Sequence, residues 1–204
     1  MKTKSILILS LLAVSAILFS FDGPPARVKY KVDAKQSTLL WTGEKVTGQH
    51  HGTIQITSGE LVAEGTVVKE GTFDINVSSL TVTDITDAES NAKLTRHLKS
   101  EDFFGVEKYP TASFIITSVT PKSGNEYTVK GKLTIKSKTN EIEFPATLTT
   151  EGKSQVASAT ITVDRSKYDI KYGSRSFFDN LGDKYIYDEF KLDLKLVAIS
   201  QAGA

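Results

Sequence analysis

Histidine and cysteine are the side chains that most often supply acid–base, nucleophilic or metal chemistry, and the chain has three histidines and no cysteine. Without cysteine there is no disulfide, thiolate metal site or cysteine nucleophile. His50 and His51 are adjacent, so on a strand they point to opposite faces and do not hold one metal ion together. His97 stands apart, and no H-x-H or H-E-x-x-H spacing occurs. We therefore expect hydrogen-bonded or solvated histidines and no metal site.

Other catalytic signatures are missing as well. A serine hydrolase is expected to carry G-x-S-x-G, and Gly173-Ser174-Arg175-Ser176 lacks the second glycine. No carboxylate pair indicates a glycosidase, and no glycine-rich loop suits a phosphate. The 25 basic and 24 acidic residues leave no basic excess for nucleic acid. The sequence predicts a non-catalytic protein without a cofactor or a nucleic-acid partner, and an enzyme using His97 or a carboxylate is the least supported class.

Large apolar side chains are the more informative group. Aromatic residues gather beside a predicted helix at 88–99 and within segment 164–188. In a barrel they either plug the interior or line a ligand site, and both alternatives stay open. The candidates for lining an apolar ligand are Trp41, Phe103, Phe104, Phe114, Leu133, Phe144, Tyr168, Tyr172, Phe177 and Phe178. The candidates for pairing with a polar head group at the mouth are Lys45, His50, His51, Tyr172 and Arg175.

Strands must position these residues, because apolar and polar residues alternate along most of the chain. The predicted strands are 28–33, 37–43, 52–57, 60–69, 71–78, 112–120, 127–136, 140–150, 157–164 and 189–198. Turns are predicted at Ser58-Gly59-Glu60, Lys69-Glu70-Gly71, Ser123-Gly124-Asn125, Thr139-Asn140 and Glu151-Gly152. Strands with one solvent-exposed and one apolar face indicate an antiparallel sheet. Closing that sheet into a barrel would leave no unpaired edge strands. We predict an all-β fold with a single antiparallel barrel of about eight strands.

Two segments break the alternation. Residues 88–99 are predicted to form one short helix flanking the barrel, with Asp87 as its cap, acids in its first turn and bases in its last. Segment 164–188 is a long connection rich in aromatic residues, and loops of that length in compact domains are usually functional or disordered. The aromatic content favours an ordered segment.

The first 21 residues differ in composition from the rest. Lys2 and Lys4 precede the apolar run 6–21, which is typical of a secretory signal peptide and too short for a spanning helix of ~20 residues. We therefore expect a signal peptide at 1–21, a short lead at 22–29 and the barrel domain at 30–200. The protein is expected to be exported, either to the periplasm or to the medium.

Several stretches resemble the YceI-like proteins, a family of exported bacterial lipid-binding barrels. The most specific is His97-Leu98-x-Ser100-x-Asp102-Phe103-Phe104-x-Val106-x-x-Tyr109-Pro110-x-x-x-Phe114. Others are Ser37-Thr38-Leu39-x-Trp41, Gly131-x-Leu133-Thr134-Ile135-Lys136 with Phe144-Pro145, and Ile161-x-Val163-x-Arg165-x-x-Tyr168. The resemblance covers about residues 30–198. It implies a lipocalin-like barrel that holds a polyisoprenoid or a similar long-chain amphiphile in an apolar pore.

The sequence departs from the family at three points. Lys45 stands where a histidine is frequent, His50-His51-Gly52 replaces a more apolar stretch, and Tyr168-Asp169 replaces Phe-Gly. The last two departures place polar groups near the predicted mouth. The ligand of other members is therefore not transferred to this chain.

The leading hypothesis is an exported carrier or scavenger of a long apolar molecule. Each methylene moved from water into an apolar pore gains ~0.8 kcal/mol, against an association cost of ~4–15 kcal/mol, so only long chains bind tightly. The alternative is a structural or stress-related interaction protein with a filled barrel. Two further partners are considered: a membrane surface in transient contact, and a second copy seated on a sheet edge or on segment 164–188.

Overall fold

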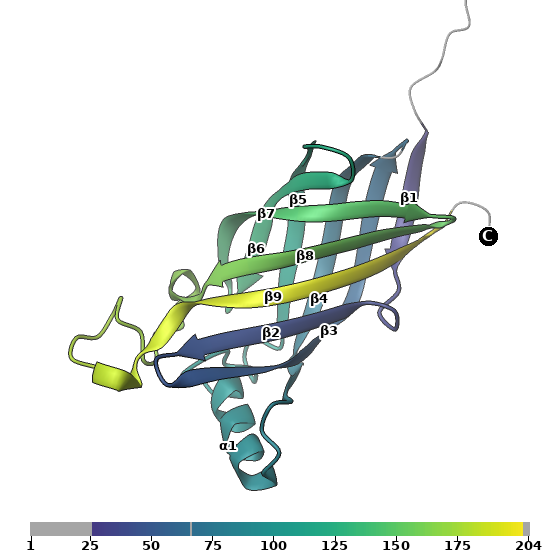
Figure 1. The fold of residues 1–204 in the computed structure, drawn as a ribbon. Coiled ribbons are helices and arrows are strands. Elements are labelled where there is room, and N and C mark those ends of the chain that lie inside the picture. The colour runs from purple at the N-terminus through teal and green to yellow at the C-terminus, as the bar shows by residue number, and fades with distance from the viewer. Residues whose placement is uncertain (1–25, 66, 202–204) are drawn as a thin grey trace, which may run out of the picture.

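The computed structural model describes residues 26–65 and 67–201, in which nine strands form one closed antiparallel sheet (Figure 1). The strand order is β1-β3-β2-β9-β8-β7-β6-β5-β4, and β3 also pairs with β4 to close the ring. The strands are β1 (Arg27–Val32), β2 (Thr38–Lys45), β3 (Gly48–Glu64), β4 (Val67–Val82), β5 (Thr111–Pro121), β6 (Glu126–Ile135), β7 (Lys138–Glu151), β8 (Ser154–Asp164) and β9 (Ile186–Ser200). The predicted antiparallel barrel is confirmed. The predicted signal peptide at 1–21 lies outside the described residues.

β1 and β2 share one position in the ring, which makes the barrel eight-stranded. β1 lies between the end of β3 and the end of β9, and its Tyr30 is opposite Leu61 of β3. β2 lies between the other halves of the same two strands, and its Trp41 is opposite Leu192 of β9. The two short strands therefore act as one interrupted wall strand.

Three predicted turns are wrong, because they lie inside strands: Ser58-Gly59-Glu60, Lys69-Glu70-Gly71 and Thr139-Asn140. Close packing explains the glycines in the first two. A Cβ on Gly59 would lie 2.7 Å from Val32 Cγ2, and one on Gly71 would lie 2.8 Å from Leu61 Cδ2. In this barrel wall a glycine therefore marks a close approach of neighbouring side chains.

The chain turns at other places. The predicted strand 60–69 is in fact two strands, because β3 ends at Glu64 and β4 begins at Val67. The β6–β7 hairpin turns at Lys136 and Ser137, whose φ angles of 48° and 61° are left-handed. Neither residue is a usual left-handed turn former, so the sequence carried no signal there. The turns predicted at 123–125 and 151–152 are confirmed.

α1 (Ala88–Lys99) is the predicted flanking helix. The Asp87 side chain accepts a hydrogen bond from the backbone N–H of Ser90 at 2.8 Å, and hydrogen bonds from Ser90 lower the pKa of that carboxyl. The helix lies across one end of the barrel, where Asn91 Nδ2 donates to the carbonyl oxygen of Val82 at 2.9 Å (Figure 1). No helix among residues 26–65 and 67–201 has the length and apolar character needed to cross a membrane.

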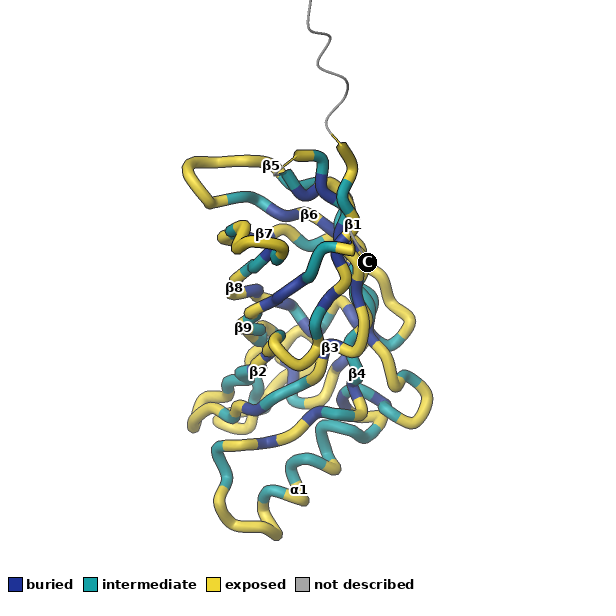
Figure 2. Tube along the Cα trace, turned by 90° about the vertical axis from the view of Figure 1, so that its right-hand side faces the viewer, coloured by how far each residue is buried: buried dark blue, intermediate teal, exposed yellow. Residues whose placement is uncertain are grey.

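Burial alternates along the strands, as Figure 2 shows. In β6, Val129, Leu133 and Ile135 are buried while Lys130 and Lys132 are exposed. The inward side chains form two large buried clusters, one towards α1 and one towards β1. The side chains packed against both clusters are only partly buried: Ile54, Ile75, Ile116, Val119, Leu148, Leu192 and Leu194. The middle of the barrel is therefore packed more loosely than its two ends.

Candidate functional site

The loosely packed interior contains an apolar passage. It consists of a mouth cavity of about 170 Å³ and an inner cavity of about 100 Å³. Both cavities have Leu39, Ile75, Leu133 and Leu192 in their walls, so they adjoin each other. Almost all of the surface that lines them is apolar. An apolar cavity of about 150 Å³ already accommodates benzene, so the mouth cavity alone is large enough for part of an organic ligand.

The passage is long and narrow. Along β9 its lining runs from Ile186 to Leu196, which is about 34 Å of strand at ~3.4 Å per residue. Wall residues such as Ile54, Ile75 and Leu194 remain partly accessible although they pack against the buried clusters. Such a space suits an extended apolar chain better than a compact molecule.

The passage opens at the end of the barrel where α1 lies. Leu94 and Leu98 are four residues apart on α1, so they share one helix face, and both line the mouth cavity. Lys45 and Tyr187 also line this cavity and are exposed to solvent. The helix therefore forms one side of the entrance, and β2 and β9 form another.

The structure brings eight of the predicted site residues together around the passage, one of which is Lys45 at the mouth. The mouth cavity is lined by Trp41, His50, Phe103, Phe104 and Leu133, and the inner cavity by Phe114, Leu133 and Phe144. The predicted residues that line neither cavity are His51, Tyr168, Tyr172, Arg175, Phe177 and Phe178. Of these six, Tyr168 is buried and the other five are exposed.

One carboxylate holds both adjacent histidines beside the mouth. His50 Nδ1 and Asp84 Oδ2 are 2.8 Å apart, and the backbone N–H of His51 donates to Asp84 Oδ1 at 3.0 Å. Partial burial raises the pKa of Asp84, but the hydrogen bonds from His50 and His51 outweigh it and hold the pKa below its ordinary value. In the part of the chain that the structure describes, no three potential metal-binding side chains come together.

Replacing Asp84 with asparagine is expected to remove an acid-sensitive part of the stability. Because the pKa is lower in the folded chain, the carboxylate stabilises the fold above its unfolded pKa of about 3.9, and this contribution is lost as pH falls through the folded pKa. From about pH 5 to about pH 2, the urea midpoint of the wild type should fall more steeply than that of Asp84→Asn. Equal acid dependence in the two proteins would contradict this role of Asp84.

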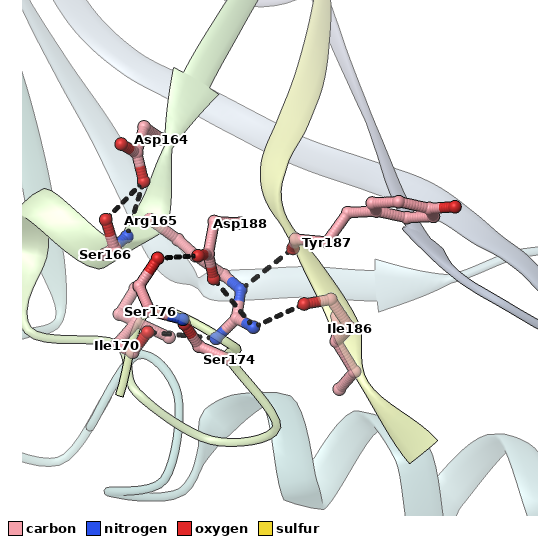
Figure 3. Close-up of polar contacts among 9 residues, drawn as sticks. All are labelled: Asp164, Arg165, Ser166, Ile170, Ser174, Ser176, Ile186, Tyr187 and Asp188. Carbon is pink, nitrogen blue, oxygen red and sulfur yellow. Dashed lines mark hydrogen bonds and ion pairs between the residues drawn. The ribbon is translucent and has the colours of Figure 1, made fainter. Parts of the chain in front are cut away.

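Arg165 fastens the segment after β8 to the start of β9 (Figure 3). Its buried guanidinium donates to the carbonyl oxygens of Ile170 at 2.9 Å, Ile186 at 3.0 Å and Tyr187 at 3.1 Å. Nη2 also lies 3.3 Å from Asp188 Oδ1, so the buried charge is paired. Burial lowers the pKa of Arg165, and the nearby carboxylates offset only part of this effect. The side chain therefore holds the rim of the mouth through both hydrogen bonds and charge.

Tyr168 lies in the core beside this network. Its side chain is 1% exposed, and its hydroxyl has no hydrogen-bond partner among the described residues. Burial, with a smaller effect from the charge of Asp164, raises the pKa of Tyr168 to about 12. The residue therefore supports the wall by packing and makes no polar contact with the passage.

His97 joins α1 to segment 164–188 outside the passage. Its ring lies edge-on to those of Phe103 and Tyr172, with centroids 5.0 and 4.5 Å apart. Its Nε2 is 3.2 Å from Asp102 Oδ2. These contacts assign His97 to the packing between the helix and the loop at the entrance.

Comparison with known proteins places this barrel in a family. Residues 30–198 match the family model described as "YceI-like domain". The chain belongs to the YceI-like family. A UPF0312 protein of Pseudomonas putida strain F1 is 26% identical over 170 residues, which cover 78% of this YceI-like chain and 85% of that protein. A UPF0312 protein of Photorhabdus laumondii is 42% identical over 64 residues, which cover 31% of this chain and 33% of that protein.

Two solved structures share the YceI-like barrel of this chain. Burkholderia cenocepacia BcnA has a TM-score of 0.65 at 24% identity, covering 81% of this chain and 98% of BcnA. A polyisoprenoid binding domain from Saccharophagus degradans, implicated in plant cell wall breakdown, has a TM-score of 0.59 at 14% identity and covers 84% of this chain and 98% of that domain. At these identities the likeness establishes the fold.

The lining residues that sequence reasoning missed in this YceI-like chain are mostly aliphatic. They include Leu39, Ile54, Ile75, Leu94 and Leu192. The strand residues among them occupy inward positions, so the alternation that predicted the strands also carried the signal for the lining. Aromatic side chains, which supplied most of the candidates, do not mark these aliphatic positions.

Proposed function

We propose that this YceI-like protein is a non-catalytic binding protein that carries or sequesters a long-chain apolar or amphiphilic lipid, isoprenoid-like in shape, inside its barrel. The apolar passage is the observation that carries the proposal. A chain entering it gains ~0.8 kcal/mol per methylene, so ten methylenes give about 8 kcal/mol against an association cost of ~4–15 kcal/mol. A small polar metabolite gains nothing from such walls.

The polar end of the ligand would stay at the mouth. Because the passage walls are apolar, a head group drawn into them would lose its hydrogen bonds to water without replacement. Glu44, Lys45 and His50 stand at the entrance and offer charged or hydrogen-bonding partners. The polyisoprenoid binding domain of Saccharophagus degradans supports the isoprenoid class, since it has the same fold. A filled barrel is not favoured, because the walls enclose open space.

We propose in addition that the protein works after export, in the periplasm or outside the cell. The basic start and the apolar run at 6–21 support this proposal. The lack of cysteine is compatible with an oxidising compartment, where packing alone must stabilise the fold.

Native mass spectrometry tests the binding function. The protein would be purified without detergent from the periplasm of its own host and then extracted with organic solvent. We expect a discrete added mass that the solvent releases as an isoprenoid or acyl lipid. A clean unliganded mass, together with no uptake of prenols or fatty acids offered afterwards, would contradict the proposal and favour an interaction protein without a ligand.

A further inference from the structure

Exposed apolar side chains gather at the end of the barrel where the passage opens. In the part of the chain that the structure describes, seven large hydrophobic side chains are exposed, and five of them belong to the β2–β3 turn or to segment 164–188. We name these five the mouth patch: Val46, Tyr172, Phe177, Phe178 and Tyr187. Figure 1 shows the loop before β9 projecting beyond the end of the barrel that lies opposite the C-terminus.

The mouth patch is continuous with the entrance of the passage. Tyr187 belongs to the patch and also lines the mouth cavity. The ring centroids of Tyr172 and Phe103 are 5.5 Å apart, and Phe103 lines the same cavity. Lys45 pairs with Ile186, which brings the β2–β3 turn beside the start of β9. Whatever covers Tyr172, Tyr187 and the β2–β3 turn therefore lies against the entrance.

The segment that carries four of the five patch residues has no net charge. Residues 169–187 contain three basic side chains, Lys171, Arg175 and Lys184, and three acidic ones, Asp169, Asp179 and Asp183. Two of the basic groups lie over aromatic rings. Lys171 Nζ is 5.3 Å from the centroid of the Phe177 ring, and Arg175 Cζ is 3.6 Å from the centroid of the Tyr185 ring. Aromatic rings at head-group level, with long basic side chains reaching past them, are typical of membrane–water interfaces. The zero net charge matches a zwitterionic surface better than an anionic one.

We propose that the mouth patch docks on the interfacial layer of a zwitterionic phospholipid bilayer and seats the entrance of the passage against the lipid. This inference rests on the proposed function, since a barrel that takes up a long apolar chain must collect it where such chains reside. Moving the chain through water would expose its methylenes to solvent, at a free-energy cost that grows with chain length. Direct contact between the entrance and the bilayer avoids that step.

Vesicle flotation tests the docking surface. Protein would be purified from the periplasm, and its mass would establish that all variants begin at the same residue. The wild type is expected to float with vesicles of pure phosphatidylcholine. The double variant Phe177→Ser/Phe178→Ser should lower the ratio of bound to free protein at least about tenfold, because two aromatic rings no longer enter the interface.

The matched control removes two exposed apolar side chains from the barrel wall. Leu40 and Ile115 are 46% and 48% exposed, close to the 42% and 49% of Phe177 and Phe178. Leu40→Ser/Ile115→Ser should change the bound-to-free ratio by less than about twofold, because the wall does not face the lipid. Raising salt to about 0.5 M, where surface charges are screened, should leave wild-type flotation within about twofold.

Three results would overturn the docking proposal. One is equal flotation of the Phe177→Ser/Phe178→Ser variant and the wild type. Another is flotation that requires phosphatidylglycerol and disappears in salt, which would mean a purely electrostatic contact. The third is a wild type that forms dimers in solution while the double variant is monomeric, which would assign the patch to a second copy.

A second measurement separates this inference from the proposed function. A fluorescent prenol added from ethanol should reach the passage without a bilayer, so the double variant should bind it as the wild type does. Wild-type protein that binds the prenol but does not float contradicts docking alone. Wild-type protein that floats but never binds the prenol contradicts the carrier function and leaves the docking surface supported.

Discussion

Changing Leu192 to aspartate is expected to abolish lipid uptake while the barrel stays folded. Leu192 lies on the wall shared by the mouth and inner cavities, so its side chain contacts any chain that passes from one to the other. A carboxylate there must be desolvated when an alkyl chain lies against it, at a cost of several kcal/mol. Affinity for a fluorescent prenol should fall at least ~100-fold, which corresponds to ~2.8 kcal/mol. Because Leu192 is only partly buried, the carboxylate can stay hydrated in the unliganded barrel.

The adjacent strand provides a control for this variant. Leu40 of β2 is opposite Asp193 of β9, faces outwards and is 46% exposed. Leu40→Asp introduces the same charge on the other face of the wall and should leave prenol binding unchanged. Circular dichroism and the urea midpoint would establish that both variants are folded. Undiminished prenol uptake by Leu192→Asp would show that the passage is not the binding site.

The barrel was predictable because its signal is repeated. Inward residues such as Leu133 and Leu192 recur at every second position, and the pattern persists whichever strand is considered. The helix was predictable from local chemistry, since the Asp87 cap depends on its contact with the neighbouring Ser90. Such signals are contained in short stretches of sequence and need no knowledge of distant contacts.

The errors arise where distant contacts decide the structure. Gly59 and Gly71 suggested turns, but their small size serves contacts with side chains of other strands. Tyr168 and Phe178 are both aromatic residues near the same loop, yet one is buried in the core and the other is 49% exposed. Residue type alone does not distinguish them, because the distinction depends on how segment 164–188 folds back onto β9.

Arg165 holds segment 164–188 against the start of β9. Its replacement is expected to have the largest effect on the free energy of unfolding. Arg165→Ala would leave the carbonyl groups of Ile170, Ile186 and Tyr187 without their donor, and Asp188 without its cation. Breaking a buried ion pair on one side costs about 3–5 kcal/mol. The urea midpoint should fall accordingly, and prenol affinity should fall with it because Ile170, Ile186 and Tyr187 line the mouth cavity.

Two further variants separate the role of Arg165 from a general loss of charge. Arg165→Lys keeps the charge but cannot reach three carbonyl groups in different directions, so it should recover little of the lost stability. Lys130→Ala breaks the exposed ion pair with Glu143, whose two charged atoms are 2.8 Å apart, and should change the midpoint little because solvent screens that pair. Trypsin gives a local measurement, since Lys171 and Arg175 lie in the segment that Arg165 fastens and should be cleaved faster in Arg165→Lys than in the wild type. If Arg165→Lys matches the wild type in both midpoint and cleavage rate, charge alone holds the entrance, and the three carbonyl contacts contribute little.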